Sequence, residues 1–148
     1  MNKSRKIASV TLWVNRLIIL TVGILILSLP AIIRWYCQYR VLTQAEQTAI
    51  TAAFYCCSVV IFAALWNMDR LLTAIIAGEV FIRKNVTRIR RIQWCCGIVS
   101  LICIPASIAY MPLVFLVVIM AFLCLCVGVV CCVMDAAVAI REENDLTI

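Results

Sequence analysis

The stretch GEVFIRKNVTRIRRIQW, residues 78–94, is the only long polar interval in a chain of 148 residues. It carries five of the thirteen Lys and Arg residues, and long apolar segments lie on both sides of it. Lys and Arg concentrate on the cytoplasmic side of membrane proteins. The flanking segments therefore predict that the chain lies in a membrane, and this stretch predicts which way round it sits.

The composition excludes an ordinary soluble domain. Apolar residues make up 66% of the chain, charged residues only 14%, and the mean hydropathy is +1.12. Soluble domains are roughly half apolar and about a quarter charged, so we expect the lipid bilayer to cover much of this chain. The formal net charge of +6 fits an excess of Lys and Arg facing anionic lipid, and we expect no direct binding of nucleic acid.

Apolar runs predict four transmembrane helices, at residues 10–33, 49–66, 92–110 and 113–134, and the first of them is free of charge from Leu17 onward. At about 1.5 Å per residue, runs of this length suit a hydrocarbon core about 30 Å thick. The first run could also be a signal peptide, but it is long for one, and no small-residue cleavage site follows it cleanly. The prediction is an all-α four-helix bundle forming one membrane domain, residues 1–148.

The segments between these runs complete the predicted topology. Residues 34–48 form the first connection, 67–91 a loop, 110–112 a tight hairpin turn and 135–148 a tail. Eleven of the thirteen basic residues then fall on the side of both termini, the 67–91 loop and the tail. By the positive-inside rule this side is the cytoplasm, so we expect a multi-pass protein of the cytoplasmic membrane with both termini inside.

Two helices are expected to extend beyond the membrane on that side. The second continues to about Ala77, and Gly78 can end it because glycine tolerates the left-handed conformation. The third begins within the basic stretch, and its helical projection separates an apolar face from a basic one: Ile82, Val86 and Ile89 against Lys84, Arg88 and Arg91. Such a segment is typical of the membrane surface, where it either fixes orientation or docks a partner or anionic lipid.

The residue types predict no enzyme, no cofactor and no metal. The chain has no histidine, which removes the commonest general base and metal ligand, and it has no nucleotide-binding or zinc-protease motif. Its ten cysteines lie mostly in apolar runs, where free Cys behaves as a small apolar residue. A convergence of four thiols from different helices stays open for Cys95, Cys96, Cys131 and Cys132.

Small residues recur every four positions on two predicted helices. They are Ala45, Ala49, Ala53 and Cys57 on the second, and Cys124, Gly128 and Cys132 on the fourth. Faces of this kind let transmembrane helices approach closely. They predict close packing within the chain or, as the alternative, the seam of a homodimer.

Four charged residues lie near the cytoplasmic ends of the predicted spans and are candidates for interfacial ion pairs: Arg16, Asp69, Arg70 and Asp135. We expect Asp135 to pair with Arg88 or Arg91 and so to lock the bundle. No charge falls deep within a span, which argues against an ion-coupled transporter.

The tail, Arg141-Glu142-Glu143-Asn144-Asp145-Leu146-Thr147-Ile148, and the loop pattern of Gly78, Phe81, Asn85, Val86, Arg88, Arg90, Arg91 and Ile92 resemble a small bacterial family of four-span membrane proteins. That family is catalogued only as a domain of unknown function. One feature departs from it: Ile82, Arg83 and Lys84 stand where members place Thr or Ser followed by acidic residues, so the usual helix cap is lost.

The resemblance implies a partner, because genes of the family often stand beside a very short helix-turn-helix regulator. It favours a non-enzymatic membrane protein that regulates or sequesters this cytoplasmic DNA-binding partner. The candidate contact residues lie on the loop and the tail: Arg83, Lys84, Arg88, Arg90, Arg91, Glu142, Glu143, Asn144 and Asp145. The acidic tail either meets a basic recognition helix or pairs with the chain's own arginines. A second candidate is an immunity or transport-like protein that binds a peptide or lipophilic compound between its helices.

Overall fold

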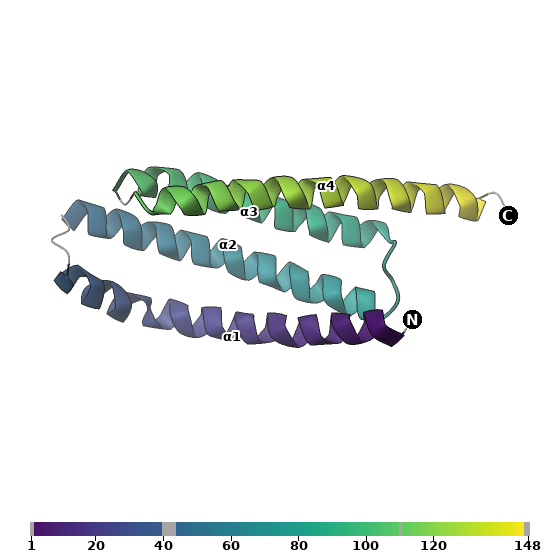
Figure 1. The fold of residues 1–148 in the computed structure, drawn as a ribbon, viewed down its shortest axis with the longest axis horizontal. Coiled ribbons are helices and arrows are strands. Elements are labelled where there is room, and N and C mark those ends of the chain that lie inside the picture. Colours follow the sequence, from purple (N-terminus) through teal and green to yellow (C-terminus); the bar gives the residue numbers. More distant parts are fainter. Residues whose placement is uncertain (1, 40–43, 110, 147–148) are drawn as a thin grey trace.

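The computed structural model describes residues 2–39, 44–109 and 111–146, and these residues form four helices in an all-α bundle (Figure 1). The helices are α1 (Asn2–Tyr39), α2 (Gln44–Ile76), α3 (Arg83–Ala109) and α4 (Leu113–Leu146). Each is long and apolar enough to cross a membrane. The chain is a multi-pass, four-helix membrane protein, which confirms the predicted fold class.

Each helix packs against its neighbours in the sequence. α1 lies on α2, α2 on α3, and α3 on α4, whereas the described parts of α1 and α4 make no close backbone contact. Figure 1 shows both termini and the connection between α2 and α3 at one end of the bundle. Residues 110–112 join α3 to α4 at the other end, and residue 110 lies outside the described ranges.

The helices are longer than the apolar runs on which they were predicted. α1 has 38 residues and α4 has 34. At about 1.5 Å per residue their lengths are about 57 and 51 Å, well beyond the thickness of a hydrocarbon core, about 30 Å. The segment predicted to connect the first two spans, residues 34–48, is helical at both ends, since α1 reaches Tyr39 and α2 begins at Gln44. Gln44, Ala45 and Glu46 favour helix, and no glycine or proline interrupts them. The tail is also helical, as far as Leu146.

The basic stretch contains the start of α3, as predicted, and the helix begins at Arg83. The predicted apolar face is confirmed, since Val86 and Ile89 are buried and pack with Cys131 and Val138 of α4. Because α3 continues without a break from Arg83 into the apolar span, the stretch runs along α4. Its position relative to the membrane surface stays a prediction.

A second buried cluster lies further along the bundle and consists of Cys57, Val99 and Cys103. Outside the two clusters, large apolar side chains cover the outer faces of all four helices; Leu27 and Ile108 are more than four-fifths exposed. An exposed apolar surface of this extent is what a lipid bilayer covers.

Gly78 ends α2 through a Schellman motif. The amide of Gly78 donates to the carbonyl oxygen of Ile75 at 3.1 Å, and the amide of Glu79 donates to that of Ala74 at 3.0 Å. The φ angle of Gly78 is 88°, in the left-handed region that a side chain disfavours. The predicted helix stop at this residue is confirmed.

We expect Gly78→Ala to destabilise the fold by about 1–2 kcal/mol, the cost of a side chain in the left-handed conformation. Thermal unfolding in detergent measures this change. The matched control is Gly23→Ala within α1, where an added Cβ meets nothing within 4 Å and helix propensity should raise stability slightly. Equal melting temperatures for the two variants would contradict the role given to Gly78.

Candidate functional site

An ion pair joins the first residue of α3 to the tail in α4. Arg83 donates from Nε to both oxygens of Glu142, at 3.1 and 3.2 Å, and from Nη2 to Oε2 at 2.8 Å. Charge-assisted bonds from a guanidinium to a carboxylate fix the geometry of both groups. Both residues lie beyond the predicted spans. The hydrogen bonds lower the pKa of the Glu142 carboxyl below its ordinary value of 4.5, and the same contact raises the pKa of Arg83.

Asp135 lies between two arginines of α3. Its carboxylate oxygens are 3.6 Å from Nη1 of Arg83 and 3.6 Å from Nη2 of Arg90. The prediction that Asp135 pairs with Arg88 or Arg91 is therefore wrong. Arg83 and Arg90 are seven residues apart, which places them two turns apart on the same side of the helix.

Arg88 points toward α2 instead of α4. Its Nη1 donates to the carbonyl oxygen of Arg70 at 3.1 Å and to Oδ1 of Asn85 at 3.0 Å. This contact ties the first turns of α3 to the last turns of α2.

Asn85 organises the connection between α2 and α3. Its side chain is fully buried, and Nδ2 donates to the carbonyl oxygens of Glu79 at 2.6 Å and Val80 at 3.1 Å. Asn85, in the first turn of α3, therefore fixes the path of the chain into this helix. Ile82, which precedes the helix, has no side-chain oxygen that could cap it. The sequence pattern contained Asn85 only as part of the family-like loop and gave it no role.

The contact between α1 and α2 is also polar at this end. Nε of Arg16 lies 3.3 Å from Oδ1 of Asp69, and the buried Asn15 donates from Nδ2 to the carbonyl oxygen of Leu65 at 3.3 Å. Arg70 joins no ion pair among the described residues; its guanidinium lies 5.5 Å from the centre of the Trp66 ring, a cation–π contact. Asn15 lies beside Arg16 in the sequence, and no pattern there marked it as buried.

All three helix–helix contacts are thus tied by polar groups at the end that holds both termini. We call this end, residues 2–16, 65–91 and 131–146, the polar end. Loop and tail meet there through Arg83, while Lys84 and Arg91 are exposed. The remaining tail candidates, Glu143 and Asn144, are exposed as well, and the side chain of Asp145 lies outside the described part of the chain.

We expect Arg83→Gln to loosen the tail, because Glu142 then loses its partner and Asp135 keeps only Arg90. Hydrogen exchange of the backbone amides in residues 136–144 should become faster. Lys84→Gln is the matched control, since it removes an adjacent exposed charge for which the described structure gives no ion pair. If both variants exchange at the rate of the unmodified chain, the ion pair does not hold the tail.

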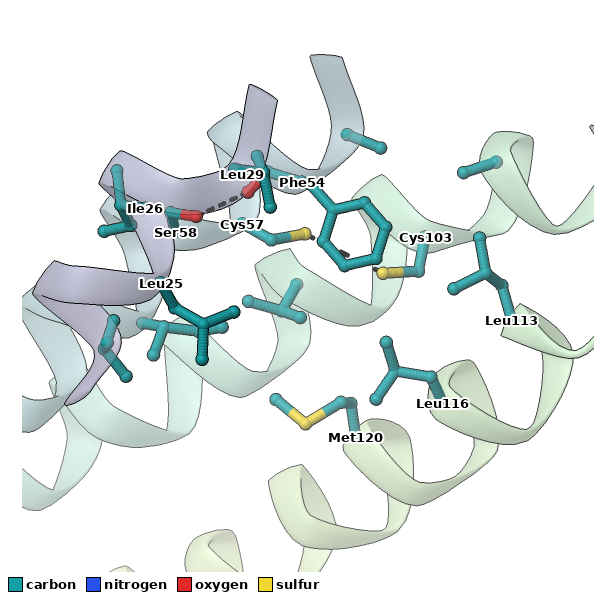
Figure 2. Close-up of a pocket in the computed structure, with 15 residues that line it drawn as sticks. Leu25, Ile26, Leu29, Phe54, Cys57, Ser58, Cys103, Leu113, Leu116 and Met120 are labelled. Atoms are coloured by element: carbon teal, nitrogen blue, oxygen red, sulfur yellow. Dashed lines mark hydrogen bonds between the residues drawn. The ribbon is translucent and has the colours of Figure 1, made fainter. Parts of the chain in front are cut away.

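The opposite half of the bundle contains an apolar pocket of about 240 Å³ (Figure 2). All four helices line it: Leu25 and Leu29 come from α1, Phe54 and Cys57 from α2, Cys103 from α3, and Leu116 and Met120 from α4. Ala106, next to Pro105, also lies in its wall. A pocket formed between helices is a common place for a small-molecule site.

The pocket offers almost no polar group to a ligand. Its one hydroxyl, on Ser58, donates to the carbonyl oxygen of Phe54 in its own helix at 2.7 Å. The thiols of Cys57 and Cys103 lie 3.7 Å apart and contact each other. No charged side chain lines the pocket, so it suits an apolar group and offers no means of acid–base chemistry.

The cysteines form no metal centre in the described ranges, where no three Cys, Asp or Glu side chains are grouped to hold an ion. Two of the three small residues on α4 pack against α3. A Cβ on Gly128 would lie 2.7 Å from Nε2 of Gln93, and one on Gly97 would lie 3.5 Å from Sγ of Cys124, whereas Cys132 is exposed. Ala53 and Cys57 of the other face line the pocket. A homodimer stays a prediction.

Comparison with known proteins gives one match. The family model described as "Protein of unknown function (DUF2975)" matches residues 11–148. No curated protein and no solved structure matches the chain.

Proposed function

We propose that this chain, which belongs to the DUF2975 family, is a non-enzymatic membrane protein that captures a small cytoplasmic DNA-binding regulator at its polar end. In this proposal it lies in the cytoplasmic membrane of a bacterium with both termini inside. The excess of Lys and Arg at the polar end supports that orientation. DNA would be bound by the partner and not by this chain.

The meeting of loop and tail at Arg83 and Glu142 carries the proposal. It brings the basic residues of α3 and the acidic residues of α4 onto one surface, and the long helices can hold that surface clear of the lipid. A partner with a basic DNA-binding helix would find carboxylates in the tail, and its own acidic groups would find Lys84 and Arg91. Complementary charge of this kind favours encounter and selects partners.

The ion pair also sets a condition on capture. Glu142 already accepts hydrogen bonds from Arg83, so a basic helix that binds Glu142 must displace this guanidinium. Two exposed ion pairs of similar strength can exchange at little net cost. Capture would therefore respond to small changes in the partner's charge, such as those that DNA binding imposes when phosphate competes for the same basic side chains.

Affinity purification from native membranes tests the proposal by comparing the full chain with one truncated after Ala139. A small DNA-binding protein recovered only with the full chain would support capture. The point variant Glu142→Gln, with Arg141→Gln as a control on the neighbouring residue, separates loss of the acidic group from loss of the helix end. Identical partners for the full and truncated chains would overturn the proposal.

The apolar pocket favours a second candidate, an immunity or transport-like protein that holds a lipophilic compound between its helices. It disfavours a peptide, because peptide groups taken into such a pocket would lack hydrogen-bond partners. Mass spectrometry of organic extracts from the purified chain tests this candidate. A compound lost in Ser58→Phe, which narrows the pocket, and kept in Val59→Phe, which faces away from it, would support binding; no such compound would overturn it.

A further inference from the structure

We propose that the apolar pocket is a binding site for one hydrocarbon chain of a membrane lipid, drawn from the leaflet opposite the polar end. The inference rests on the second candidate function and names its ligand class. It is independent of capture at the polar end, which lies in the other half of the bundle.

The shape and position of the pocket match a lipid chain. Its lining covers residues 22–29, 53–61, 99–106 and 113–120, about 10–12 Å along each helix at about 1.5 Å per residue. It therefore extends along the helix axes, the direction in which lipid chains run in a bilayer. Leu113, the first residue of α4, lies in its wall, so the pocket reaches the end of the bundle where a lipid head group can stay in the interface.

The walls select hydrocarbon over water or a polar ligand. A buried water molecule needs two to four polar partners, whereas the hydroxyl of Ser58 is already bonded within α2. A charged or zwitterionic head group would find no counter-charge among the lining residues. An alkyl chain pays no desolvation cost on entering this site, because it exchanges one apolar surrounding for another.

The arrangement of the helices lets a lipid hydrocarbon chain enter the pocket between α1 and α4. α2 and α3 pack together behind the pocket, whereas the described parts of α1 and α4 both line it without packing on each other, as Figure 2 shows for Leu25 and Met120. This side faces the bilayer. A helix of a second copy is too large for a pocket of about 240 Å³, because a helix with its side chains is about 10–12 Å across.

The test uses the full chain in nanodiscs of phosphatidylethanolamine and phosphatidylglycerol, part of which carries a diazirine midway along one acyl chain. After illumination, mass spectrometry maps the labelled residues. We expect label on the pocket-lining faces of α1 and α4, and we expect Ser58→Phe to reduce it by roughly tenfold, the ratio for a site weakened by about 1.4 kcal/mol. Val59→Phe is the control, since Val59 is 72% exposed on the same helix and does not line the pocket.

The outcomes distinguish failure of the lipid-chain site from failure of the second candidate function. Equal pocket labelling in both variants, or label on outward-facing residues only, overturns the lipid-chain site. A non-lipid compound that co-purifies and excludes the label also overturns it, but leaves the second candidate function standing. Should Ser58→Phe fail to fold by circular dichroism, Ala53→Trp fills the same pocket, and Ala52→Trp, exposed one residue away, is its control.

Discussion

Asn85→Ala is expected to lower the free energy of unfolding by roughly 1–3 kcal/mol, since it removes the buried amide that donates to the carbonyl oxygens of Glu79 and Val80. The connection between α2 and α3 depends on this one side chain for its shape. Its Oδ1 also accepts a hydrogen bond from Arg88, so the contact between the two helices would weaken as well.

Chemical or thermal unfolding in detergent, with unchanged helix content as a check, measures the loss. Asn67→Ala is the matched control, because Nδ2 of Asn67 donates to the carbonyl oxygen of Ala63 in its own helix. That change should cost no more than about 0.5 kcal/mol, the usual range for a position without a tertiary role. If Asn85→Ala and Asn67→Ala lose the same stability, the loop carbonyls find other partners.

Val99→Asp is expected to destabilise the membrane-embedded bundle by about 3 kcal/mol or more, the cost of a carboxylate at the centre of a transmembrane helix. Val99 is only 2% exposed and packs with Cys57 and Cys103. No cation lies among the residues lining the adjacent pocket that could pair with the new group. Most of the variant should therefore be lost as aggregate or degraded protein.

The yield of monodisperse protein after extraction from the membrane measures this effect. Val99→Thr is the control, because a threonine of similar shape can donate its hydroxyl to a carbonyl of its own helix. It should cost about 1 kcal/mol, the typical effect of a point substitution. A normal yield of Val99→Asp would show that water reaches this position, and the apolar character of the pocket would then be wrong.

The spans were predictable because they depend on local composition alone. An uninterrupted apolar run of sufficient length has few alternatives to a transmembrane helix, and Gly78 carries its own conformational signal. The burial of Val86 and Ile89 followed from helical periodicity. The helix ends could not be predicted from periodicity. Beyond the apolar runs, α1, α2 and α4 continue through residues that favour helix without forming an apolar stripe.

The site was less predictable because its partners come from different helices. Asp135 pairs with Arg83 and Arg90 only because of the rotation of α3 against α4, which the sequence does not encode locally. Asn85 bonds backbone carbonyls that any residue would supply. The pocket is lined mainly by aliphatic side chains, with Phe54, Met120 and two cysteines. These residue types also pack tightly elsewhere in the bundle, so no residue pattern marks the pocket.

The sequential packing of the helices bears on how the protein is made. Each helix meets its partner as soon as that partner has been synthesised, so no segment has to wait in the bilayer for a later one. Contacts between neighbours in sequence also favour rapid folding. The pocket is different, since its fourth wall comes from the last helix to emerge. An arrested chain that ends after α3 would hold a paired, inserted core with an unfinished pocket.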